Sequence, residues 1–556
     1  YQFRLVDEIK AGSDTIFIMA FRPKTKSKFN GLEGVVYIHS HKYAISHFIG
    51  SSTDATGERE SKIEQVYTIE NGRWFPKELN YDLVFHKYPF PGIGFSVNGH
   101  SVISGLSFPP EELLKIDKTY SVRLGDSVDL YTNRDWERFR TDSITARETM
   151  TYHIMDSIFQ KVKAEKIIAA AGKLVIGRLP LGKFELDITR LMARNKYEGT
   201  RVGFGVYTGD KISGFFSTGG WLGYGTKDQV MKYGLSATFF PGGKKDNWVE
   251  VRYQKEYQSP GNYRIHPDLD RTGFRNWILS LADEVRGPSL NVHLHKGYWQ
   301  LDFSGAKQEI FTRYDNGFRY RGMALRAFDH LETGVGVRFA FGEKRIPAFG
   351  YYLPTPTRFP ILYFKLVTGR INSGEYRADY IRAHAAFTFR KHINRWGNDN
   401  FRLEAGIIKS FDRQPLSRSF LLAGNGFRSE GLHYFAWGGF LTMRPYDFYN
   451  DRYISLLYKH DLDWYIWETS FSKPFLSLGH NFLYGNLSLV NKMANDRIVS
   501  TGEGFHETGL MMNQLLQVKL FHAFYLYLNA GGYYHWNGAF DWRKNGVWVF
   551  GFSAGI

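Results

Sequence analysis

Hydrophobic and polar residues alternate one by one along most of the chain after about residue 166. Across residues 231–239 the odd positions are apolar and the even positions are small or polar, and residues 381–390 alternate in the same way. Successive side chains of a β-strand point to opposite faces, so each segment has one apolar and one polar face. The pattern predicts strands here and in four further segments, at residues 248–254, 298–303, 334–341 and 401–407.

Two stretches without acidic or basic residues, 474–491 and 520–540, are long enough to test as membrane-spanning helices. Such a helix needs ~20 predominantly apolar residues. Both stretches are interrupted by Gly, Asn, Ser and His, and the second has the sequence Asn-Ala-Gly-Gly at residues 529–532. We therefore exclude helical spans, and we expect the second stretch to form a strand, a break and another strand.

The apolar faces of these strands are rich in aromatic residues, and the polar faces carry Arg, Lys, Gln, Glu, His and Gly. In the last segment Trp548, Phe550 and Phe552 share one face, while Val547 and Gly551 lie on the other. Aromatic girdles toward lipid and a wet interior are typical of outer-membrane barrels. The sequence predicts an all-β fold with a transmembrane antiparallel β-barrel. A soluble propeller or solenoid is the alternative, although no repeat of fixed period is visible.

The predicted barrel covers residues 166–556 and has about 16 strands, with 14 or 18 as alternatives, at roughly 10 residues per strand. Residues 259–283 do not alternate, and we expect them to form a long extracellular loop. Residues 1–135 are predicted to form a small periplasmic β domain. Residues 136–165 form a linker with one amphipathic helix, whose start fits a capping box from Thr145 to Glu148.

Within the front domain, residues 61–85 predict a β-hairpin around the dipeptide Asn71-Gly72. The order of the runs FIMAFRPK, GLEGVVYIHSHKYAISHF and VYTIENGRWFPKEL resembles the curved, half-open sheet of periplasmic lipoprotein carriers. That resemblance implies a concave apolar face that holds acyl chains. A purely structural adaptor in the periplasm is the alternative.

Composition narrows the candidate chemistry. The chain has no Cys, so disulfides, Cys-ligated zinc and thiol nucleophiles are impossible. Its net charge of +16 is dispersed, without a run of five or six basic residues. The charge suits nucleic acid, anionic lipid or lipopolysaccharide. For a barrel we expect outer-membrane lipid and lipopolysaccharide as partners, and no nucleic acid. A generally basic surface is the alternative.

Motifs for catalysis are missing from the sequence. We find no H-E-x-x-H zinc motif, phosphate-binding loop, G-x-S-x-G elbow or dinucleotide fingerprint. The pairs His39/His41 and His293/His295 have a spacing that suits a metal, but no third ligand can be named. We therefore predict no catalytic, cofactor-binding or metal residues, and we expect that the protein is not an enzyme.

Several motifs stand in a specific order: residues 179–184, 195–201 and 223–228, and then FLTMRPYDF at residues 440–448. With the front domain, they resemble an uncharacterised family of Bacteroidota outer-membrane proteins. That family has a carboxypeptidase-regulatory-like domain, a domain of unknown function and a barrel. The resemblance covers the chain from Tyr1, and it implies that the regulatory-like domain precedes Tyr1 and is missing here. The family has no established activity to carry over.

The barrel is also similar to the BamA/TamA-like assembly and translocation superfamily. There a long loop folds into the lumen, and the Arg of an Arg-Gly-aromatic motif pairs with acidic residues on the wall. The resemblance places Arg444 and Tyr446 in that motif, with Asp447 beside them, although Pro445 replaces the glycine. An arginine in a lumenal loop needs a carboxylate partner. The alternative is a surface-loop arginine next to a turn proline.

Four functions are compatible with this pattern. The first is a non-enzymatic factor in outer-membrane biogenesis or export, which inserts or translocates proteins, lipoproteins or lipids. The second is a passive or gated porin with anion preference. The third is a barrel subunit that anchors a larger envelope complex, and the fourth is a barrel enzyme. A separate front domain is superfluous for a simple porin, so we rank biogenesis or export first.

Overall fold

A computed structural model gives the fold of the chain. It describes residues 1–24, 31–53, 59–86, 95–106, 135, 137–138, 144–162, 177–243, 245–261, 265–266, 269, 280–315, 317–348, 351–428, 433–435, 437–469, 471–520 and 524–555. These residues form one large sheet, a separate seven-stranded sheet and a few short elements.

The large sheet has eighteen antiparallel strands and follows the order of the chain. Three of them are short: β8 (Arg178–Leu181), β9 (Phe184–Asp187) and β10 (Met192–Asn195). The long strands are β11 (Gly199–Thr208), β12 (Phe216–Gly225), β13 (Met231–Phe239), β14 (Trp248–Gln258), β15 (Asp283–Lys296), β16 (Trp299–Thr312), β19 (Ala327–Ala340), β22 (Ile361–Ser373), β23 (Tyr376–Ile393), β24 (Gly397–Ser410), β28 (Arg452–Leu462), β29 (Phe475–Asn486), β30 (Phe505–Leu520), β31 (Phe524–His535) and β32 (Gly546–Gly555).

The alternation in the sequence sorts side chains to the two faces of this sheet. On β13, Met231, Leu235 and Phe239 are at least half exposed on the outer face, whereas Lys232 is fully buried on the inner face. On β32, Trp548 is 63% exposed. This confirms the predicted all-β barrel architecture, with an apolar outer face and polar groups inside.

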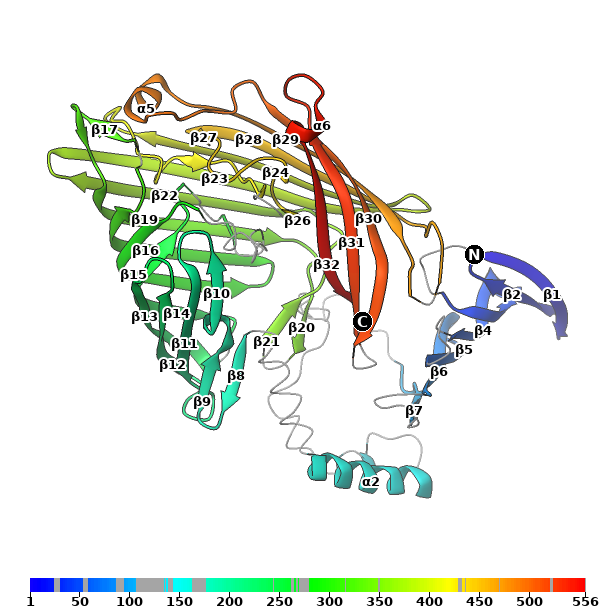
Figure 1. Cartoon of the computed structure of the whole chain (residues 1–556). Coiled ribbons are helices and arrows are strands. Elements are labelled where there is room, and N and C mark those ends of the chain that lie inside the picture. Colours follow the sequence, from blue (N-terminus) through cyan, green and yellow to red (C-terminus); the bar gives the residue numbers. More distant parts are fainter. Residues whose placement is uncertain are drawn as a thin grey trace.

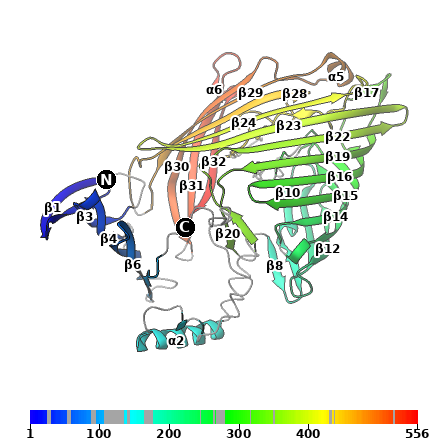
Figure 2. The same ribbon diagram turned by 180° about the vertical axis from the view of Figure 1, so that it is seen from behind.

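The sheet curves around an interior but does not close within the described residues (Figures 1 and 2). β32 pairs with β31 along one edge, and the first strands lie at the other end of the sheet. The predicted barrel of about 16 strands is therefore an open sheet of eighteen. At that edge, two residues of β32 pair with a segment from another part of the chain, described below.

β31 corrects one expectation. The sequence Asn-Ala-Gly-Gly at residues 529–532 predicted a break, but β31 runs through it as one strand. A Cβ atom on Gly531 would lie 2.3 Å from the carbonyl oxygen of Leu510 on β30. The glycines therefore permit a close approach of neighbouring chains, which is one of the roles of glycine inside a strand.

The front of the chain forms a separate antiparallel sheet in which the strands follow chain order. The predicted hairpin is confirmed, because β5 and β6 flank Asn71 and Gly72, both with positive φ. No structural finding tests the domain boundaries at residues 135 and 165, and residues 107–134 lie outside the described residues. The strands are β1 (Gln2–Ala11), β2 (Asp14–Arg22), β3 (Glu33–His39), β4 (Ala44–Thr53), β5 (Arg59–Glu70), β6 (Arg73–Phe85) and β7 (Phe95–Val102).

Helix α2 (Ala146–Val162) begins with the predicted capping box. The Thr145 amide donates to the Glu148 carboxylate at 2.7 Å, and the Glu148 amide donates to the Thr145 hydroxyl at 3.3 Å. Its apolar residues Met150, Ile154 and Met155 are exposed. No helix among the described residues combines the length and apolar character that crossing a membrane requires.

The connections between long strands carry the remaining elements. They are η1 (His41–Tyr43), η4 (Ile188–Arg190), η5 (Pro241–Gly243), β17 (Arg319–Tyr320), β18 (Met323–Ala324), β20 (Arg345–Ala348), β21 (Tyr351–Pro354), β25 (Leu422–Ala423), β26 (His433–Tyr434), β27 (Tyr449–Asn450), α5 (Leu489–Ala494) and α6 (Trp542–Asn545).

Candidate functional site

The connection between β24 and β28, residues 411–451, packs against the inner face of the large sheet. We call it the lumenal segment. Seven of its Leu, Phe and Met side chains have an exposed fraction of 2% or less: Leu416, Phe420, Leu421, Leu422, Phe440, Leu441 and Met443. Burying a side chain of this size contributes about 1.5–3 kcal/mol. The lumenal segment is therefore a packed part of the fold.

Three clusters join the lumenal segment to different parts of the wall. Its first part packs with inward residues of β15, β19, β22 and β23, such as Val285 and Val367. Phe440 and Met443 pack with β28, β29 and β30. Leu441 belongs to a cluster with residues of β30, β31 and β32, among them Val549. The segment thus spans the interior from the middle of the sheet to its last strand.

A fully buried carboxylate clamps the lumenal segment to β30. Glu507 accepts hydrogen bonds from the amides of Leu441 at 3.0 Å and Thr442 at 2.9 Å, and from the Thr442 hydroxyl at 2.7 Å. Asn481 on β29 donates a fourth bond at 2.7 Å. A buried carboxylate is costly unless it is well hydrogen-bonded, and these four donors meet that need.

The connection that contains α5 holds the first part of the lumenal segment. The Leu416 amide donates to the Asn491 side chain at 2.7 Å, and the Asn495 side chain donates to the Leu416 carbonyl at 2.9 Å. The Arg418 amide donates to the Asn495 side chain at 3.2 Å. Side-chain amides thus satisfy backbone groups that would otherwise be buried without partners.

The predicted motif Arg444, Tyr446 and Asp447 lies near the end of the lumenal segment. The Arg444 side chain is exposed, and its backbone amide donates to the Asp447 carboxylate at 3.2 Å. Partial desolvation raises the pKa of Asp447, and hydrogen bonding to the Arg444 amide together with nearby positive charge partly offsets that rise. No ion pair joins Arg444 to the wall among the described residues. The role of this motif stays a prediction.

Tyr446 is the member of the motif that contacts the wall connections. Its hydroxyl accepts a hydrogen bond from Ser259 at 2.9 Å and donates to the Leu281 carbonyl at 3.2 Å. Both partners belong to the connection between β14 and β15, for which we predicted an extracellular loop. The described residues of that connection contact the lumenal segment, because Gly261 exchanges backbone hydrogen bonds with it. The extracellular position of the loop stays a prediction.

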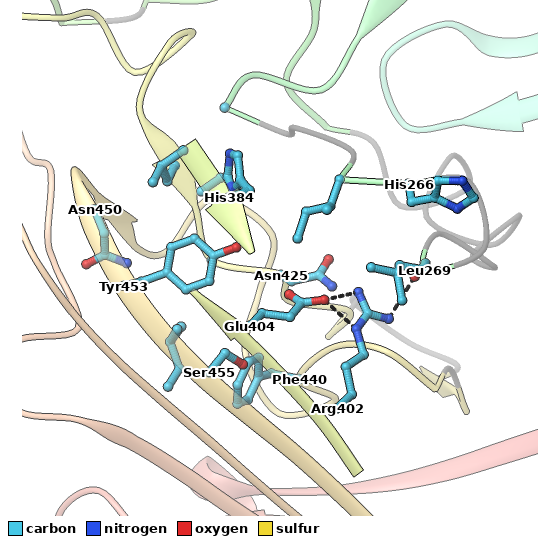
Figure 3. A pocket seen from close by; sticks show the side chains of 16 residues that line it. His266, Leu269, His384, Arg402, Glu404, Asn425, Phe440, Asn450, Tyr453 and Ser455 are labelled. Carbon is cyan, nitrogen blue, oxygen red and sulfur yellow. Dashed lines mark hydrogen bonds and ion pairs between the residues drawn. The ribbon is translucent and has the colours of Figure 1, made fainter. Parts of the chain in front are cut away.

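A small polar cavity lies between this connection, the lumenal segment and the wall (Figure 3). Arg402 and Glu404 of β24 form an ion pair on its floor, and Arg402 also donates to the Leu269 carbonyl at 2.7 Å. The cavity has a volume of about 80 Å³, which suits a few waters.

The edge of the last strand is occupied by the same lumenal segment. His433 and Tyr434 of β26 pair in parallel with Val549 and Phe550 of β32, and the Phe435 amide donates to the Phe550 carbonyl at 2.7 Å. β26 covers two of the ten residues of β32. An open sheet edge is a template for pairing with another strand.

Charged pairs stiffen the inner face at the other end of the sheet. Lys232, which is fully buried, contacts Glu198 at 2.8 Å and Asp228 at 2.6 Å. Arg201 contacts Glu256 at 2.6 Å. No group of three or more metal-ligating side chains occurs in the part of the chain that the structure describes. Of the predicted histidine pairs, His293 bonds to Asp302 at 2.7 Å.

Sequence reasoning singled out residues 440–448 within the lumenal segment, but missed the residues that fix the segment in place. Glu507 shares its face of β30 with Phe505 and Met511, so alternation gave no signal for it. Nothing in the residues around His433 indicates pairing with β32. The hydrogen bonds of Glu507 and the pairing of His433 with β32 both join residues that are far apart in the chain.

No protein-family model matches the chain, and no curated protein matches its sequence. Among solved structures it is similar to CdiB from Acinetobacter baumannii, with 11% identity and a TM-score of 0.34 over 67% of this chain and 60% of that one. It is also similar to BamA from Haemophilus ducreyi lacking POTRA domains 1–3, with 9% identity and a TM-score of 0.38 over 65% and 69%. The first match spans less than two thirds of the known structure.

Proposed function

We propose that this chain is a non-enzymatic outer-membrane protein that acts in outer-membrane biogenesis or export. It inserts or translocates proteins, lipoproteins or lipids, alone or within a larger envelope complex, and its front domain lies in the periplasm. The observation that carries the proposal is the edge of β32, which among the described residues pairs only with residues 433–435 of the lumenal segment.

The unpaired backbone groups on this edge of β32 support the proposed function. Backbone N–H and C=O groups that face hydrocarbon without a partner cost several kcal/mol each. β26 satisfies the edge at Val549 and Phe550. An extended client segment that pairs with the rest of β32 would satisfy further groups, and it would compete with β26 for the same positions. The lumenal segment then acts as a resident occupant of a client site.

A porin is the alternative function from the sequence. It requires a wide, wet interior, but the lumenal segment buries seven large apolar side chains against the inner face. The Glu507 clamp holds that segment through two backbone amides. These contacts favour biogenesis or export over passive diffusion. The assignment to a Bacteroidota family remains part of the proposal.

A disulfide lock tests the role of the β32 edge. Tyr434 and Phe550 are direct Cα partners, and adjacent strands lie about 4.8 Å apart, which permits a disulfide. The chain has no other Cys, so the double variant Tyr434→Cys/Phe550→Cys forms one defined bond. The matched control is Ala385→Cys/Ala405→Cys, a pair on β23 and β24 that never needs to separate.

The readout is the amount of barrel proteins, lipoproteins and lipopolysaccharide in outer membranes of cells whose sole copy is each variant. We expect the oxidised lock at β32 to reduce at least one of these classes, and we expect a reductant to restore it. The control lock should leave all three unchanged. Normal outer membranes with the β32 lock fully oxidised would show that release of this edge is not required and would refute the proposal.

A further inference from the structure

The outer face of the large sheet carries a charged hollow near the strand ends that flank the connection between β16 and β19. It crosses β14, β15, β16, β19 and β22 and has a volume of about 880 Å³. The register places its Arg, Lys, Glu and Asp residues on one face: Arg286 is opposite Glu309, and Glu309 is opposite Asp329. In the next row, Lys307 is opposite Leu331 and Leu331 is opposite Arg370.

Gly287 and Pro288 open the hollow in the middle of β15. A Cβ atom on Gly287, which has a φ of +143°, would lie 2.3 Å from the Lys307 carbonyl oxygen. Pro288 has no amide hydrogen to donate to the neighbouring strand. The ladder between β15 and β16 has no paired residues at these two positions. The wall is therefore indented next to Arg286 and Lys307.

The charges in the hollow are only partly neutralised by one another. Arg286 donates to the Tyr253 hydroxyl at 3.1 Å, and Arg370 contacts Asp379 at 2.6 Å. Lys307 is exposed and forms no ion pair with a described residue. Two basic groups without a full carboxylate partner, Lys307 and Arg286, thus face the solvent or lipid side of the wall.

Two carboxylates in the same hollow face each other. Glu309 and Asp329 are exposed direct cross-strand partners, and neither forms an ion pair with a described residue. Arg286 lies opposite Glu309 on the other side and offsets part of its charge, but Asp329 has no such cross-strand partner. Like charges directly opposite each other destabilise a sheet, so the carboxylate pair favours a bound cationic group. The hollow is therefore complementary to a ligand that carries a negative and a positive charge a short distance apart.

The position of the hollow on the wall indicates what kind of molecule reaches it. Away from the strand ends, the outer face continues as an apolar band in which Leu290, Phe364 and Phe303 are each more than 40% exposed. Tyr253 stacks with Tyr233 at the level of the hollow, as aromatic residues do at the boundary of a bilayer. Leu331, which is half exposed, connects the hollow to the apolar band.

We propose that this hollow binds the headgroup of a membrane lipid that carries both a phosphate and a primary ammonium group, a phosphoethanolamine lipid. Lys307, with Arg286 and Arg370 beside it, binds the phosphate. The ammonium group lies between Glu309 and Asp329, and the acyl chains run along the wall over Leu331. This site lies on the outer wall and does not depend on the function proposed for the edge of β32.

Native mass spectrometry of the purified full chain tests the site. The protein in mild detergent is titrated with phosphatidylethanolamine and with phosphatidylglycerol of the same acyl chains. We expect phosphatidylethanolamine to bind more tightly, and Lys307→Gln to weaken that binding about fivefold. The control Lys391→Gln removes an exposed lysine near the opposite end of β23 and should leave the affinity unchanged.

Substitution of a carboxylate gives a second test, in which the preference between the two lipids changes. Glu309→Gln should reduce the affinity for phosphatidylethanolamine and abolish its advantage over phosphatidylglycerol. Neither Glu309 nor Asp329 forms an ion pair with a described residue, so the substitution leaves no ion-pair partner behind. An unchanged heat-dependent gel shift verifies folding. Equal binding of the two lipids by the native protein, or equal weakening by Lys307→Gln and Lys391→Gln, would overturn the proposal. Displacement of the lipid by inorganic phosphate alone would overturn it too, because the site would then be a simple anion site.

Discussion

Glu507 is the side chain that most directly couples the lumenal segment to the wall. The substitution Glu507→Gln keeps its size and removes its charge. In the native protein one carboxylate oxygen accepts from the Leu441 amide and from Asn481, and the other accepts from the Thr442 amide and hydroxyl. Glutamine has one acceptor oxygen, so its NH2 group must face one of these two pairs of donors.

The magnitude follows from the bonds that are lost. If the NH2 group faces Thr442, the hydroxyl can turn to accept, but the Thr442 amide is left buried without a partner. An unsatisfied buried amide costs about 1–3 kcal/mol. A central value of ~2 kcal/mol lowers the free energy of local opening of the lumenal segment by that amount. Amide exchange that proceeds through this opening then accelerates about 30-fold.

Hydrogen–deuterium exchange of peptides that cover residues 437–448 measures this change. We expect faster exchange in Glu507→Gln and unchanged exchange in the strand hairpin of β22 and β23, which the clamp does not contact. Glu503→Gln is the control, since it makes the same substitution at an exposed position four residues earlier. Equal protection of residues 440–443 in the native protein and in Glu507→Gln would refute the clamp.

Two further substitutions test other contacts. Lys232→Met leaves the buried carboxylates of Glu198 and Asp228 without their ion-pair partner and should destabilise the sheet by about 3–5 kcal/mol. The loss of heat-resistant mobility in gels measures this change, and Lys227→Met, at an exposed position, is the control. Arg444→Glu should change stability by less than about 1 kcal/mol, because the side chain is exposed. If it also leaves the cell phenotype unchanged, Arg444 does not act as a lumenal latch.

The strands of the wall were predictable because their pattern is local. Met231 and Leu235 alternate with Lys232 and Gly234, and the structure places the first pair outside and the second inside. The same reasoning located the capping box at Thr145. It failed for residues 529–532, because a glycine in a strand marks either a break or a close approach, and only the neighbouring strand decides which.

The fixing contacts of the lumenal segment were not predictable, because they depend on residues distant in sequence. Glu507 meets amides 65 and 66 residues earlier in the chain. The pairing of His433 with Val549 in β26 and β32 is short and parallel, and no sequence pattern indicates it. The sequence also does not predict that the sheet is open, because alternation shows on which face of a strand a side chain lies but not which strand pairs with its edge.

The central claim is that the lumenal segment fills the interior, and that a client segment pairs with the edge of β32. Conductance of the purified full chain in planar lipid bilayers tests this claim most directly. We expect no steady conductance from the native protein, and brief openings when Glu507→Ala removes all four hydrogen bonds of the clamp. A stable, ohmic, anion-selective conductance of the native protein would contradict the account and identify the chain as a porin.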